Sequence, residues 1–178
     1  MPSSDKRLVR RLCIDAMLLG VALMLSYLEA ILPLGALVPL PGFRLGLAQT
    51  VVTLTFFLVG KSDAAMVSGV RVLMMGLLFG NAGSVWFSVC GAALAYLGLW
   101  LGHLLLRRRC SYIGLGVLCA ALHNAGQCLA AAAMFGSGVL LSYLPVLLIA
   151  SVIFGAIGGL LLNLLVPRLS RRSGGAHS

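Results

Sequence analysis

The chain has 178 residues, of which 61% are hydrophobic and only 10% are charged, and its net charge at pH 7 is +9. Soluble domains contain about 25% charged residues, so this composition excludes an ordinary soluble fold and indicates an integral membrane protein. The basic residues stand at the ends of apolar segments, a placement that directs membrane insertion. No nucleic-acid partner is therefore expected.

Six apolar segments follow one another, and each is predicted to be a membrane-spanning helix. They cover residues 12–32, 44–60, 64–80, 84–106, 112–135 and 139–166. The second and third are short for a bilayer core about 30 Å thick, and they would span it by local thinning or be partly buried by neighbours. The sequence predicts an all-α, polytopic membrane domain over 12–166, with a basic tail at 1–11 and a basic, flexible tail at 167–178.

The distribution of charge predicts the topology. If the amino terminus is cytoplasmic, eleven of the 13 basic residues fall in the cytoplasmic tails and connections, where the excess of Lys and Arg belongs. Both ends are thus predicted to face the cytoplasm of a bacterial inner or plasma membrane. The first apolar segment is too long for the core of a signal peptide, so it is predicted to be the first span.

The cysteines lack the C-x-x-C spacing of metal or redox sites. All lie in or beside apolar segments, where thiols pack as small apolar groups; they are Cys13, Cys90, Cys110, Cys119 and Cys128. No metal and no cofactor is predicted. A subunit of a redox complex is a weaker alternative, because the sequence contains no haem motif and no iron–sulfur spacing.

Charged side chains are costly in hydrocarbon, so each one is a candidate functional residue. Glu29, near the outer end of the first span, and Arg44, at the start of the second, would either form an ion pair or separately meet a substrate. Arg71 lies near mid-membrane and would either snorkel to the inner face or clamp a carboxylate or phosphate in a cavity. Asp15, one turn from Arg11, is predicted to be solvated or paired with that arginine.

The strongest local signal is ALHNAGQ in the fifth segment. His123 and Gln127 are four residues apart, and Asn124 and Gln127 are three apart, so all three are predicted to lie on one side of one helix. They would line a wet cavity or hydrogen-bond a neighbouring helix.

The stretch VPLPGFRLGLAQTVVTL interrupts the apolar pattern. Pro39 and Pro41 stiffen a loop, and Gly42 provides its turn. Arg44 then begins a helix whose first N–H groups lack partners, and its charge opposes the helix dipole. We expect an anion to bind there. The residues that follow form a small and polar face suited to lining a cavity: Gly46, Ala48, Gln49, Thr50 and Thr53.

Small residues recur four apart in the first and last segments, at Ala16 and Gly20 and at Gly155 and Gly159. Such pairs let helix backbones approach closely in lipid. They would pack within the chain, or, for Ala16 and Gly20, dock a partner membrane subunit.

These motifs carry a family resemblance over most of residues 12–166. PGFRLGLAQTVVTL resembles the P-G-x-[KR]-L-G-L-A-[NQ]-x-x-T-L motif of the Gx transporter family, also known as component I of heptaprenyl diphosphate synthase. AALHNAGQ resembles that family's A-H-N-x-G-Q segment. Gln49 departs from the pattern, because asparagine is common there.

That family is similar to the S components of energy-coupling-factor transporters. The resemblance implies a six-helix bundle that binds a small, vitamin- or precursor-like and possibly anionic solute from outside. A transmembrane coupling subunit would dock at Ala16 and Gly20, and ATPases would supply energy. The implied substrate-binding residues are Glu29, Arg44, Gln49, Arg71, His123, Asn124 and Gln127.

The alternative is a non-catalytic accessory subunit of heptaprenyl diphosphate synthase in isoprenoid and menaquinone biosynthesis. Prenyl diphosphate chemistry holds Mg²⁺ on clustered carboxylates, whereas the four acidic residues here are scattered: Asp5, Asp15, Glu29 and Asp63. The chain also lacks a G-x-x-x-x-G-K-[ST] nucleotide loop. It is therefore predicted not to be an enzyme by itself.

Overall fold

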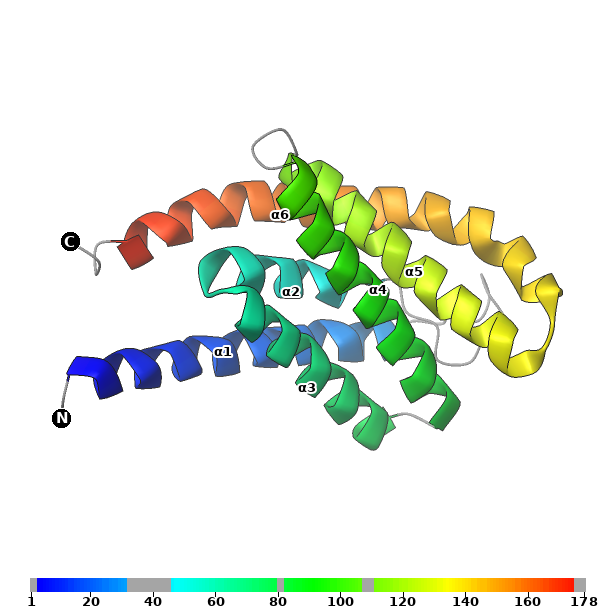
Figure 1. The fold of residues 1–178 in the computed structure, drawn as a ribbon, viewed down its shortest axis with the longest axis horizontal. Helices are drawn as coiled ribbons and strands as arrows, with labels where there is room; N and C mark the ends of the chain where they lie inside the picture. The colour runs from blue at the N-terminus through cyan, green and yellow to red at the C-terminus, as the bar shows by residue number, and fades with distance from the viewer. Residues whose placement is uncertain (1–2, 32–45, 80–81, 107–110, 175–178) are drawn as a thin grey trace.

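A computed structural model describes residues 3–31, 46–79, 82–106 and 111–174, and every regular element among them is helical. Figure 1 shows the arrangement of the elements, which are α1 (Ser3–Ile31), α2 (Leu47–Leu58), α3 (Lys61–Phe79), α4 (Ala82–Leu106), α5 (Tyr112–Phe135), the 3-10 helix η3 (Gly138–Tyr143) and α6 (Leu144–Gly174). The predicted all-α fold is confirmed for these residues.

Three of the helical segments are long and apolar enough to cross a membrane: Gly83–Leu105, Tyr112–Phe135 and Gly138–Ser170. The other three helices differ from them in length or charge. Helix α2 has only 12 residues, a length of about 18 Å, and α1 and α3 carry charged residues. The fold is thus that of a membrane protein, and the count of six spans stays a prediction.

The helices extend beyond the predicted spans at both ends. The basic stretch expected as a tail forms the first turns of α1, which begins at Ser3. Helix α6 continues through Pro167 to Gly174, where a flexible tail was expected. Proline removes one backbone donor inside a helix, but the helix continues on the remaining hydrogen bonds.

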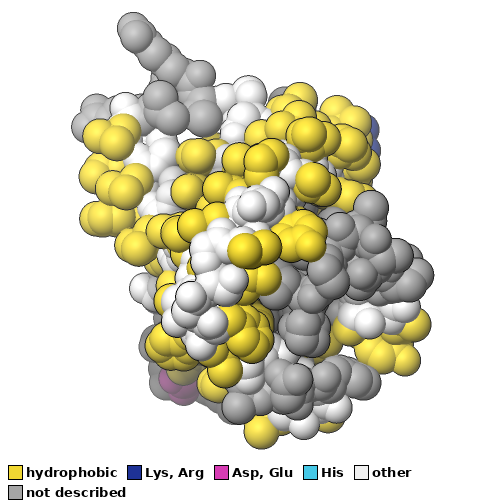
Figure 2. All heavy atoms as spheres, turned by 90° about the vertical axis from the view of Figure 1, so that its right-hand side faces the viewer, with side chains coloured by type: hydrophobic (Ala, Val, Ile, Leu, Met, Phe, Trp, Pro, Cys, Tyr) yellow, Lys and Arg dark blue, Asp and Glu magenta, His cyan; other side chains and the backbone are white. Residues whose placement is uncertain are grey.

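Helix α2 occupies the middle of the bundle. It packs against α1, α3 and α6, while α5 lies between α4 and α6. The start of α1 and the end of α6 lie on the same side of the molecule (Figure 1). Seen from the opposite end, the described surface is mostly hydrophobic, and charged side chains show only at its edges (Figure 2).

Glycines allow α5 and α6 to pack with their backbones in contact. A Cβ atom on Gly116 would lie 2.4 Å from the carbonyl oxygen of Gly155, and one on Gly159 would lie 2.4 Å from Cα of Ile113. No larger residue fits without separating the helices. Gly155 and Gly159 therefore pack within the chain, as one of the two interpretations predicted.

The other pair of small residues, in α1, is exposed. Ala16 and Gly20 are both exposed on α1, and a Cβ atom on Gly20 would meet nothing within 4 Å. This face of α1 is therefore available to lipid or to another subunit.

An ion pair joins α1 to α3 near the start of both helices. Nε of Arg11 donates to Oδ1 of Asp63 over 2.9 Å, and Nη2 donates to Oδ2 over 2.6 Å. These hydrogen bonds hold the pKa of the Asp63 carboxyl below its ordinary value. Asp15 is buried, so the prediction that it is solvated is wrong; it lies close to Arg11, but the ion pair of Arg11 is with Asp63.

The glycine contacts predict opposite effects of two alanine substitutions. Gly159→Ala should force α5 and α6 apart and lower the free energy of unfolding by about 1–3 kcal/mol. Gly20→Ala is the matched control, and it should be neutral or slightly stabilising because alanine favours helix. Thermal unfolding in detergent, followed by tryptophan fluorescence, measures both. Equal shifts in Tm would contradict this packing.

Candidate functional site

The start of α2 is capped by a carboxylate from another helix. Gly46 precedes the helix with φ of +86°, a left-handed conformation that favours glycine. The first amide of α2, that of Leu47, donates a hydrogen bond to Oε1 of Glu29 on α1. Glu29 is 1% exposed, so the carboxylate satisfies a helix start inside the protein and complements its dipole.

This contact changes the interpretation of the helix start. We expected an external anion to bind where α2 begins, but the chain supplies its own anion in Glu29. Arg44, the predicted cationic partner at this position, lies outside the described residues.

His123 on α5 packs against the same helix start. A Cβ atom on Gly46 would lie 3.5 Å from Cδ2 of His123, and one on Gly91 of α4 would lie 3.2 Å from its Cε1. The imidazole thus occupies space that glycines on two other helices leave open. Four helices meet around it and around the capped end of α2.

Gln127 lies one turn further along α5 and contacts the same imidazole. Its Nε2 is 3.0 Å from Nε2 of His123. The two side chains share a hydrogen bond whose direction depends on the imidazole tautomer. Both side chains are buried, at 2% and 3% exposed, and they form the pair predicted from their spacing.

Asn124 points to a different neighbour. Its Nδ2 donates to Oγ of Ser151 over 2.7 Å and to the carbonyl oxygen of Leu147 over 3.3 Å, both on α6. All three side chains of the cluster are buried, but Asn124 hydrogen-bonds to α6 while His123 and Gln127 contact each other. Asn124 fastens α5 to α6, the alternative role considered for this cluster.

Gln49, in the first turn of α2, is the least satisfied of the predicted site residues. Its side chain is 1% exposed, and among the described residues neither amide atom has a hydrogen-bond partner. A buried donor or acceptor left unmade costs about 1–3 kcal/mol, so water or a solute is needed to satisfy it. We call Glu29, Gln49, His123 and Gln127 the polar centre.

Arg71 is buried on α3, at 3% exposed. Snorkelling would place its guanidinium outside the protein, so this alternative does not hold. Helix α3 packs against α1, α2 and α4, and Arg71 belongs to the interior that these helices share.

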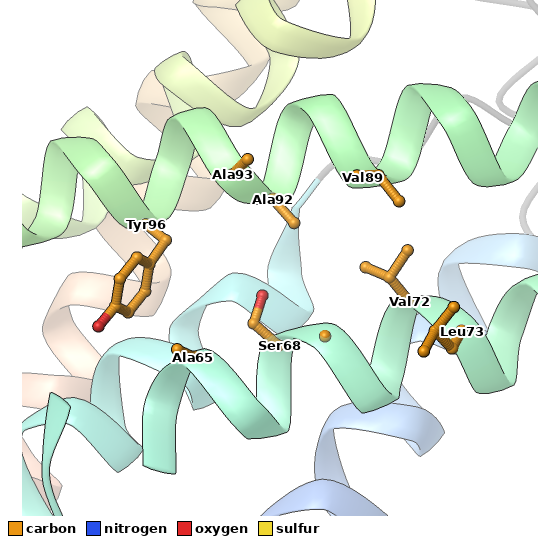
Figure 3. A pocket seen from close by; sticks show the side chains of 9 residues that line it. Ala65, Ser68, Val72, Leu73, Val89, Ala92, Ala93 and Tyr96 are labelled. Atoms are coloured by element: carbon orange, nitrogen blue, oxygen red, sulfur yellow. The ribbon is translucent and has the colours of Figure 1, made fainter. Parts of the chain in front are cut away.

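Two hollows are lined by described residues, and neither includes a residue of the polar centre in its lining. One, of about 270 Å³, separates α3 from α4; Ser68 points into it among apolar residues, and Tyr96 lies at one end with its hydroxyl bonded to the carbonyl oxygen of Lys61 (Figure 3). The other, of about 310 Å³, lies between α1, α2 and α6 and is almost wholly apolar. In the described part of the chain, no three His, Cys, Asp or Glu side chains gather to hold a metal.

A family comparison identifies the chain. Residues 18–165 match the family model for heptaprenyl diphosphate synthase component I. The chain belongs to this family. The match confirms the resemblance inferred from the two motifs, and it contains all four residues of the polar centre. No curated protein and no solved structure matches the chain.

For this member of the component I family, the comparison favours the accessory-subunit alternative over transport, because the family is described as part of a synthase.

Several buried polar groups were not predicted from the sequence. Ser26 and Ser88 have buried hydroxyls without hydrogen-bond partners among the described residues, and Ser151 holds Asn124. Ser26 and Glu29 are three residues apart on α1, and this spacing could have predicted that both lie on one face of the helix.

Substitution of Glu29 tests the cap. Glu29→Ala should leave the Leu47 amide without an acceptor and lower the free energy of unfolding by about 0.5–2 kcal/mol, the usual effect of losing a cap. Glu29→Gln keeps an acceptor oxygen and should lose less. Thermal unfolding in detergent compares the three proteins. A Glu29→Ala protein as stable as the wild type would contradict the capping role.

Proposed function

We propose that the chain is a non-catalytic membrane subunit, component I, of heptaprenyl diphosphate synthase. The observation that carries this proposal is the family match over residues 18–165. The three long apolar helices agree with a subunit held in the membrane. A separate soluble subunit would perform the prenyl transfer.

The positions of the acidic residues support the non-catalytic role. Prenyl diphosphate chemistry needs Mg²⁺ held by neighbouring carboxylates. Here Glu29 caps α2 and Asp63 is bonded to Arg11. Asp15 is buried close to Asp63, and Asp5 lies in the exposed first turn of α1. Glu29 and Asp63 are thus engaged within the chain, and no third carboxylate joins Asp15 and Asp63 among the described residues, so we expect Mg²⁺ and the diphosphate to be held by the partner.

The charge of the chain suggests where that partner docks. Both ends are basic and, in the predicted topology, face the cytoplasm of a bacterial inner membrane. The exposed Arg7, Arg10 and Arg168 belong to these ends. A soluble, aspartate-rich synthase would be attracted to this face, and a prenyl product would be released beside the bilayer.

Reconstitution tests the proposed subunit role. The purified chain in lipid nanodiscs should bind the aspartate-rich synthase of the same cell, and prenyl chain elongation should be higher for the pair than for either protein alone. The same synthase with empty nanodiscs is the control. Absence of binding, together with full activity of the synthase alone, would overturn the proposal.

One observation favours a second candidate, a solute-binding subunit similar to an S component. Gln49 is buried next to the capped start of α2, and in the part of the chain that the structure describes its amide has no hydrogen-bond partner. A small polar solute could accept and donate the missing hydrogen bonds. A coupling subunit would then dock on the exposed face of α1 at Ala16 and Gly20, and ATPases would supply the energy.

Mass spectrometry of small molecules released from the purified chain tests this candidate. A solute should be retained by the wild type and lost from Gln49→Leu, which removes the amide at similar volume. Asn163→Leu is the matched control, because Asn163 is exposed on α6. Equal retention in both variants, or no solute from the wild type, would contradict solute binding at Gln49.

A further inference from the structure

The apolar hollow between α1, α2 and α6 is a groove along the bundle. Helices α1 and α6 both pack against α2 and lie on either side of it (Figure 1). The hollow has a volume of about 310 Å³, and its two walls are formed by Leu18, Val21 and Leu25 of α1 and by Ile157, Leu161 and Leu165 of α6.

The groove is long and apolar. The lining residues recur three or four apart, so each wall is one face of its helix. Leu18 to Leu25 and Ile157 to Leu165 each rise about 10–12 Å along their helices. Val21 and Leu161 are 49% and 48% exposed. An extended hydrocarbon chain matches this shape and chemistry, and the surrounding bilayer supplies such chains.

One end of the groove is basic. Arg168 lies one turn after Leu165 on the same side of α6 and is exposed. Side chains on a helix lean toward its amino terminus, which directs Arg168 back toward the groove. On α1, Arg7 continues the side of Leu18 toward the same end, whereas the charge of Arg11 is paired with Asp63. In the described part of the chain, exposed Lys and Arg are found at this end of the bundle.

We propose that this groove binds an anionic phospholipid, with an acyl chain between α1 and α6 and the phosphate at Arg168. Charge complementarity fixes the orientation: the headgroup lies at the basic end, in the leaflet where the chain termini lie. Each basic residue near an anionic membrane surface contributes about 1 kcal/mol. The lipid would also fill the space between α1 and α6 and hold them on α2.

The groove and the polar centre use different faces of α2. Leu47, Thr50, Val51 and Leu54 line the groove, and their spacing makes them one face of the helix. Gln49 lies on the other side, so changes in the groove can be made without touching the polar centre. Lipid binding is thus separable from the proposed function.

Native mass spectrometry of the full chain in detergent tests this site, with phosphatidylglycerol and phosphatidylcholine of identical acyl chains as probes. The wild type should retain one phosphatidylglycerol and much less phosphatidylcholine. Arg168→Gln should weaken phosphatidylglycerol binding about fivefold, the equivalent of one lost basic contact. Val21→Trp should fill the groove and weaken binding about tenfold or more, because several buried methylenes are lost.

Met24→Trp is the matched control, because Met24 is also exposed on α1 and does not line the groove. It should bind phosphatidylglycerol like the wild type, and unchanged Tm values would show that the variants fold. Equal retention of the two lipids would overturn the proposal, as would equal losses in Val21→Trp and Met24→Trp. Displacement of phosphatidylglycerol by farnesyl diphosphate would also overturn it and would assign the groove to a prenyl chain.

Discussion

The hydrogen bond from the Leu47 amide to Glu29 is the contact on which the interior depends. Helix α2 is short and begins at a partly buried position, where its first N–H groups lack partners within the helix. An unmade buried donor is costly, and a carboxylate satisfies it while complementing the helix dipole. The same contact fixes α1 against α2 and sets Gly46 beside His123.

Two parts of the bundle are each held by specific contacts, and they pack together where α2 meets α6, with α4 packed on α5. Helices α5 and α6 are joined by backbone contact at Gly116, Gly155 and Gly159 and by the Asn124–Ser151 hydrogen bond. Helices α1, α2 and α3 are joined by the Glu29 cap and by the Arg11–Asp63 ion pair. The polar centre lies where His123 of the first part meets the start of α2. A ligand or partner bound there would contact both parts.

The apolar runs of the sequence predicted the helices. The cost of polar groups in hydrocarbon predicted that the polar residues are buried. Gly155 and Gly159 followed from their spacing. The hydrogen-bond and ion-pair partners between helices could not be predicted, because helical spacing indicates which residues share a face but not which helix covers that face. Asn124 therefore went to Ser151, and Arg11 went to Asp63, although Asp15 is nearer in sequence. The Glu29 cap was missed for the same reason, since it joins residues 18 apart in sequence on two different helices.

The polar centre of this component I family member is thus held together by contacts within the chain itself. Amide hydrogen exchange at Leu47 tests this claim most directly, measured by NMR on leucine-labelled protein in detergent. The account predicts slow exchange in the wild type and fast exchange in Glu29→Ala, with the amides in the middle of α5 unchanged in both. Fast exchange at Leu47 in the wild type would contradict it, because the start of α2 would then be open to water.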